Sequence, residues 1–150
     1  MAADASLISR LYQAFAKYPP GRAFGCTYCY SEEELAYFAA TPLMEIPIDR
    51  LASMLHETGD HWESTEAYKH FLPRLLEVMG PPHFVEDVYL EHTFETLLFH
   101  GFNFWPEAER SAVLDYLRAI ESEIHFQDEI DHNEWARGMS KISAPPLRLS

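Results

Sequence analysis

The spacing of the apolar residues constrains the fold of this chain more than any other feature. Apolar side chains recur three and four residues apart through most of the 150 residues, which is the period of an amphipathic α-helix. No run of five or more residues alternates cleanly between apolar and polar side chains, as a half-buried strand would. We therefore expect an all-α fold.

Proline, glycine and capping residues divide this pattern into six or seven helices. We predict helices over residues 6–18, 31–40, 47–58, 64–79, 85–99, 106–124 and 128–137. Ser31 and Glu34 have the spacing of a capping box, and Pro73 should kink or divide the fourth helix. Short loops imply antiparallel neighbours in a bundle or in irregular stacked helical hairpins. We expect one helical domain over residues 1–138 and a loose tail over 139–150, which lacks periodicity and contains two prolines.

The charge balance narrows the classes of partner. The chain has 11 Lys and Arg against 24 Asp and Glu, which gives a formal net charge of -13. Such a surface repels phosphate, so we expect no nucleic-acid partner. No stretch of about 18 apolar residues is present, so we expect no membrane span. The first residues lack the basic and apolar regions of a secretory signal, which predicts a cytoplasmic protein.

The two cysteines form the one motif with a recognised chemical spacing, Cys26-Thr27-Tyr28-Cys29. As half of a zinc site the motif needs two further ligands, and His56 and His61 are the best pair by sequence. As a redox pair it would lie before the helix that Ser31 caps, where the helix dipole lowers a thiol pKa. As a structural feature, both cysteines would be small buried hydrophobes in a turn. The sequence leaves these three interpretations open, although two cysteines argue against a disulfide scaffold.

The remaining histidines give little sign of metal or catalytic chemistry. His70, His92 and His100 fall on or near apolar stripes, which is typical of core or boundary residues with satisfied hydrogen bonds. Only Glu129 and His132 have the Glu-x-x-His spacing of di-iron bundles, which require two such pairs. The metalloprotease, nucleophile-elbow, P-loop and dinucleotide-binding motifs are absent. No catalytic motif supports an enzyme, and we expect a protein that is not one.

The helix around Pro73 has two interpretations. Pro73 can kink the helix so that it wraps around the core. Alternatively, the kink can open a groove lined by Trp62, Tyr68 and Phe71. Aromatic residues at helical spacing are usually core, which favours the first interpretation.

Three stretches resemble those of a family of small, uncharacterised bacterial all-helical proteins. They are the C-x-x-C motif after the first predicted helix, the segment from Tyr68 to Glu77 with its Phe-Leu-Pro core, and the Trp-Pro-x-x-Glu stretch from Trp105 to Glu109. The resemblance covers about a third of the chain and implies no reaction. In size, charge and helicity the chain is also similar in type to immunity proteins that are encoded beside toxins.

Two hypotheses for function follow. In the first, the chain is a binding or inhibitory protein whose acidic surface docks a basic protein partner, as an immunity protein does. The candidate contact residues lie at predicted helix starts or on polar faces: Glu32, Glu33, Asp60, Glu63, Glu66, Glu86, Asp87, Glu91 and Glu95. In the second, it is a small zinc or thiol-redox protein centred on Cys26 and Cys29, with His56 and His61 as further metal ligands.

Overall fold

The computed structural model describes residues 5–25, 30–55, 57, 59–81, 90–124 and 129–144. Over these residues the fold is all-α, with three short 3-10 helices and one isolated β-bridge in addition. The α-helices are α1 (Ala5–Phe15), α2 (Glu32–Ala40), α3 (Ile48–Leu55), α4 (Thr65–Met79), α5 (Leu90–Phe99), α6 (Glu107–Glu121) and α7 (Glu129–Ser143). The 3-10 helices are η1 (Leu43–Glu45), η2 (Gly59–His61) and η3 (Phe102–Phe104). No helix in these ranges is long and apolar enough to cross a membrane.

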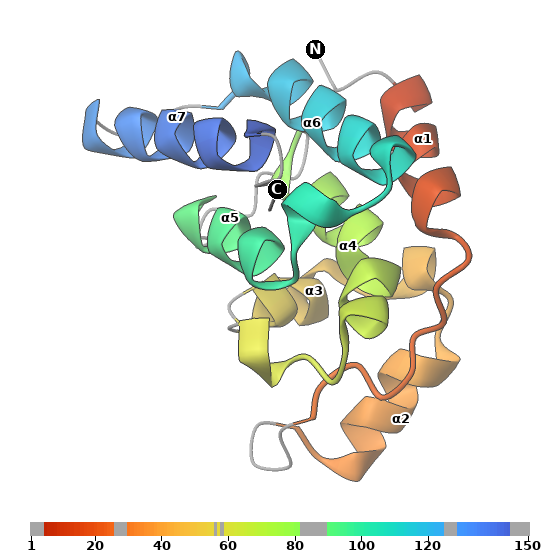
Figure 1. Cartoon of the computed structure of the whole chain (residues 1–150). Coiled ribbons are helices and arrows are strands. Elements are labelled where there is room, and N and C mark those ends of the chain that lie inside the picture. The colour runs from red at the N-terminus through yellow and green to blue at the C-terminus, as the bar shows by residue number, and fades with distance from the viewer. Residues whose placement is uncertain are drawn as a thin grey trace, which may run out of the picture.

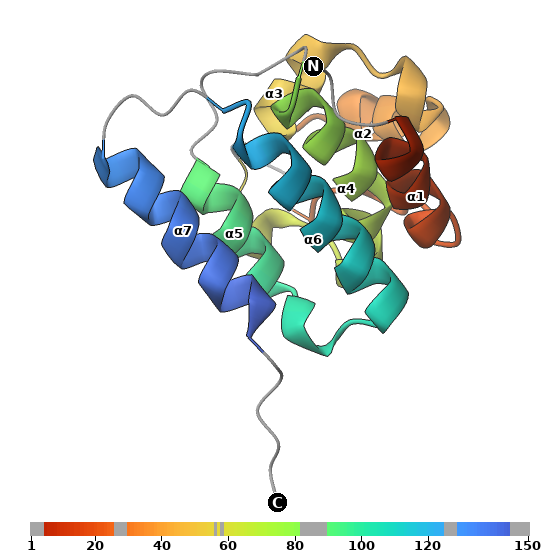
Figure 2. The same ribbon diagram turned by 90° about the horizontal axis from the view of Figure 1, so that it is seen from above.

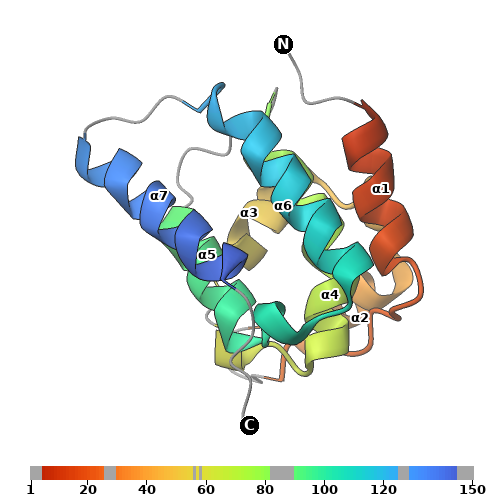
Figure 3. The same ribbon diagram turned by 45° about the horizontal axis from the view of Figure 1, so that its top comes forward.

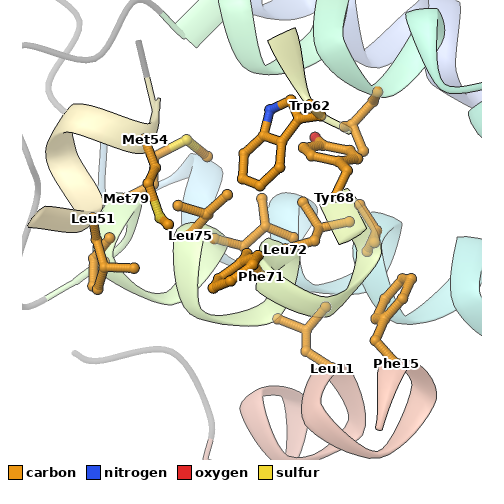
Figure 4. Packing of buried hydrophobic residues seen from close by; sticks show 14 of the residues in the cluster. Leu11, Phe15, Leu51, Met54, Trp62, Tyr68, Phe71, Leu72, Leu75 and Met79 are labelled. Carbon is orange, nitrogen blue, oxygen red and sulfur yellow. The ribbon is translucent and has the colours of Figure 1, made fainter. Parts of the chain in front are cut away.

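Helix α4 lies at the centre of the fold (Figures 1 and 2). It packs against α1 and α3, while α6 packs against α1, and α5 packs against α7. Most side chains of α4 are buried, because its apolar residues lie on several faces of the helix rather than on a single stripe. Figure 4 shows Phe71, Leu72 and Leu75 of α4 between side chains of α1 and α3.

Two neighbouring long helices, α4 and α6, run in the same direction. Lys69 in the first half of α4 pairs with Glu109 at the start of α6. Tyr116, further along α6, donates a hydrogen bond to the carbonyl of Leu76, further along α4. The expectation of antiparallel neighbours came from short loops, and since α5 separates α4 from α6 in the sequence, this pair does not test it.

Helices α5 and α7 also run in the same direction (Figure 3). The Phe94 ring contacts Trp135 in the first half of α7. Asn103, beyond the end of α5, donates hydrogen bonds to the carbonyls of Lys141 and Ala144 at the end of α7. By contrast, α1 is antiparallel to α6, as the Arg10–Asp115 and Tyr18–Glu109 contacts show.

Several predicted boundaries differ from the structure, and three of the differences have consequences for packing. Helix α1 ends at Phe15 rather than at residue 18, because Tyr18 precedes a proline and is disfavoured in a helix. Residues 139–143, which we expected in a loose tail, form the last turns of α7, where Ile142 is buried. Pro73 does not divide α4, which runs unbroken through it.

Candidate functional site

The start of α2 presents three consecutive glutamates to solvent, Glu32, Glu33 and Glu34. The predicted capping box is confirmed, because the Ser31 hydroxyl accepts from the Glu34 amide and the Glu34 carboxylate accepts from the Ser31 amide. Carboxylates in the first turn also interact favourably with the positive end of the helix dipole. The capping box thus sets the first residue of α2 and places the three glutamates in its first turn.

The extended segment before α2 forms backbone hydrogen bonds with the segment just before α4. Phe24 and Trp62 form the β-bridge, in which the Gly25 amide donates to the His61 carbonyl at 2.9 Å. The Glu63 amide donates in turn to the Ala23 carbonyl at 2.9 Å. The Phe24 ring packs on the Trp62 ring with centroids 4.2 Å apart. These contacts hold two segments together that are about forty residues apart in the sequence.

Arg22 joins the acids of these two segments. Its backbone amide donates to the Glu63 carboxylate at 2.6 Å, and its guanidinium binds both carboxylate oxygens of Glu32. The bidentate hydrogen bonds from Arg22, followed by its positive charge, lower the pKa of Glu32. Sequence spacing gave no sign of this link, because it depends on the turn that contains Arg22.

We define the acidic surface as the exposed carboxylates gathered on either side of this turn: Glu32, Glu33, Asp60, Glu63 and Glu66. Asp60 belongs to η2, and Glu66 lies in the first turn of α4, which Ser64 caps by accepting from the Ala67 amide. Figure 1 shows the start of α2 and the start of α4 on either side of the extended segment.

Of the other predicted contact residues, the structure describes the side chain of Glu95 alone, which lies apart from this surface. Glu95 is exposed on α5, where it faces α7. Glu91 lies in the first turn of α5. Glu86 and Asp87 are outside the described residues.

A histidine–carboxylate pair lies beside the acidic surface. Nδ1 of His61 is 2.6 Å from Oε2 of Glu57, and the other carboxylate oxygen accepts from the Tyr30 hydroxyl at 2.9 Å. Nε2 of His92 lies 2.6 Å from the Glu57 carbonyl oxygen. Sequence analysis singled out His61 but missed Glu57 and Tyr30 as its neighbours.

The structure describes one of the four proposed metal ligands, His61. Cys26, Cys29 and His56 lie outside the described residues. Among the described residues, no group of three or more His, Cys, Asp or Glu side chains is arranged to hold a metal ion.

A buried ion pair lies between α4 and α6. Nζ of Lys69 is 2.7 Å from Oε1 of Glu109, and the side chains are only 9% and 2% exposed. The other carboxylate oxygen of Glu109 accepts from the Tyr18 hydroxyl at 2.5 Å, and Lys69 lies over the Trp105 ring. Burial, reinforced by Glu109, raises the pKa of Tyr18 to about 12. Both charges occupy positions on apolar stripes, a signal that sequence analysis could have used.

His70 on α4 makes the hydrogen bond predicted for a boundary residue, whereas His100, directly after α5, fits the prediction only in part, because its buried Nε2 has no hydrogen-bond partner among the described residues. Nδ1 of His70 lies 2.8 Å from the Tyr18 carbonyl oxygen. Nδ1 of His100 lies 3.0 Å from the Thr65 hydroxyl, and its ring stacks on Tyr68. Burial lowers the pKa of His100.

The groove expected as one alternative around Pro73 does not form. Trp62, Tyr68 and Phe71 are all buried and pack on one another (Figure 4). The cavity beside Trp62 and Tyr68 measures about 10 Å³, which is about the space that one water molecule needs. These aromatic residues therefore belong to the core.

No protein-family model, curated protein or solved structure matches this chain.

Proposed function

We propose that this chain is an acidic binding or inhibitory protein that docks a basic protein partner on the acidic surface, in the manner of an immunity protein. One observation supports it most: carboxylates from two distant segments gather around the turn at Arg22. The single positive charge of this turn is already bound to Glu32. The surface therefore keeps a strong excess of negative charge.

Two carboxylates of this surface are available to a partner. The Glu33 and Glu66 side chains are exposed and make no hydrogen bond or ion pair within the described part of the chain. The Glu32 and Glu63 carboxylates instead hold the Arg22 turn in place. Complementary charge of this kind accelerates encounter with a cationic partner and is screened by salt.

The test is affinity capture from the native host with the whole chain as bait. We expect a basic protein that is released as salt rises from low to physiological concentration and beyond. The double variant Glu33→Gln/Glu66→Gln should weaken its capture at least threefold. The control Glu45→Gln/Glu107→Gln removes the same charge from exposed positions outside the acidic surface and should leave capture unchanged. Capture that is indifferent to salt, or equal for the two double variants, contradicts the proposal.

A small zinc or thiol-redox protein is the second candidate, and the contact between His61 and Glu57 favours the zinc form. A carboxylate bonded to one ring nitrogen orients a metal-binding histidine through the other nitrogen. Elemental analysis of protein purified without a histidine tag tests it. About one zinc per chain, lost in His61→Gln and in Cys26→Ser, supports this function. If no metal is found, thiol titration before and after mild oxidation tests the redox form.

A further inference from the structure

The surface between the parallel helices α5 and α7 carries an open groove of about 150 Å³, separate from the acidic surface. Its exposed apolar surface comes mainly from the half-buried Leu98 of α5, because Phe94, which also lines it, is only 3% exposed. Gly138 of α7 packs against the Phe94 ring, and a Cβ atom at this position would come within 2.2 Å of that ring. The glycine therefore lets the two helices approach closely beneath the groove.

Two cations on the α7 side of the groove have no side-chain partner among the described residues. Eight of the ten described Lys and Arg side chains are bound to a carboxylate, a carbonyl or an aromatic ring: Arg10, Lys17, Arg22, Arg50, Lys69, Arg74, Arg110 and Arg118. The remaining two are Arg137 and Lys141, and both line the groove. They are four residues apart on one face of α7. On a chain with a net charge of -13, two unpaired cations at one groove point to an anionic group as ligand.

The opposite wall carries the complementary charge. Glu95 of α5 is exposed, lines the same groove and forms no ion pair with Arg137 or Lys141 within 4.0 Å. Glu134 adds a second carboxylate on the α7 side. Glu95 thus faces Arg137 and Lys141 across the groove without pairing with them.

We propose that this groove binds a free α-amino acid with an apolar side chain. The carboxylate of such a ligand would pair with Arg137 and Lys141, its ammonium with Glu95, and its side chain would cover the half-buried Leu98. A fatty acid would leave Glu95 unpaired, and a simple amine would leave both cations unpaired. The groove has room for about ten to fifteen waters, which suits a ligand of about nine non-hydrogen atoms better than a drug-sized molecule.

Titration of the whole chain with L-leucine, followed by the amide NMR signal of Gly138, tests the proposal. We expect saturable shifts with a dissociation constant on the order of 1 mM. Two ligands share the apolar body of leucine and lack one charge: 4-methylpentanoate has no ammonium, and 3-methylbutylamine has no carboxylate. Each should bind at least about tenfold more weakly than leucine, since each loses one pairing.

Charge-neutralised variants then assign each end of the ligand. In Glu95→Gln, leucine and 4-methylpentanoate should bind equally, whereas in Arg137→Gln/Lys141→Gln, leucine and 3-methylbutylamine should bind equally. Glu33→Gln, on the acidic surface, is the matched control and should preserve the wild-type ranking. Absence of saturable leucine shifts, or binding of all three ligands with the same affinity by wild-type protein, overturns the proposal. The wild-type ligand series decides the matter even if a variant fails to fold, and its outcome is independent of the basic partner.

Discussion

The buried pair between Lys69 and Glu109 gives the sharpest prediction for stability. Replacing Lys69 with Met keeps the apolar stem but leaves the Glu109 carboxylate, 2% exposed, without its closest cation. Loss of one partner of a buried pair costs about 3–5 kcal/mol. Two groups remain near the carboxylate, namely the Tyr18 hydroxyl and Nζ of Lys17 at 3.5 Å. We therefore expect the free energy of unfolding to fall by about 3 kcal/mol, at the lower end of that range.

Urea unfolding of a double-mutant cycle at pH 7 tests this reasoning. Lys69→Met and Glu109→Gln should each destabilise, and the double variant should be less destabilised than the sum of the two, by about 2 kcal/mol. Arg10→Met is the control, because its ion pair with Asp115 is about half exposed and contributes about 0–1 kcal/mol. A loss below about 1 kcal/mol in Lys69→Met, together with additive effects in the cycle, would refute the view that burial makes this pair costly to break.

Three further predictions concern packing, capping and pH. Gly138→Ala should lower the free energy of unfolding by about 1–3 kcal/mol, because the added Cβ meets the Phe94 ring; an unchanged urea midpoint would show that α7 shifts freely on α5. Ser31→Ala should cost about 1 kcal/mol in the same assay, since the Glu34 amide loses its acceptor, and the conservative Ser31→Thr should retain most of it. Burial lowers the pKa of His100, so its neutral form stabilises the fold above the unfolded pKa of about 6.5, and this contribution is lost as the pH falls through the lowered pKa. Melting temperatures measured from pH 7.5 to pH 4 should therefore decline less in His100→Gln than in the wild type, and equal declines would contradict this assignment.

The helical fold could be predicted because each signal is local. Ser31 and Glu34 lie three residues apart and form the capping box that their spacing indicates. The buried residues of α6, such as Val113 and Tyr116, follow the helical period. By contrast, the end of α7 was misplaced, because Gly138 is a poor helix former whose close contact with Phe94 arises only on packing.

The direction of neighbouring helices and the composition of the candidate site depend on contacts over long sequence separations. Short loops predict the direction only of helices that they join, and they do not predict that α4 and α6, which α5 separates, lie side by side and run in the same direction. The candidate contact residues were chosen as acids at helix starts, and only the β-bridge at Phe24 brings Glu32 beside Glu63. Their spacing in the sequence, 31 residues, carries no information about that proximity.

The position of α7 at one edge of the fold has a consequence for its dynamics. Within the described residues α7 packs chiefly on α5 and η3, so its docking depends on one side of the molecule. Elements held in this way open with less free energy than the global unfolding reaction. Amide hydrogen exchange in α7 should therefore be faster than in α4, and any small molecule bound between α5 and α7 would slow exchange in α7 selectively. The edge helix would then report occupancy of the groove while the rest of the fold stays closed.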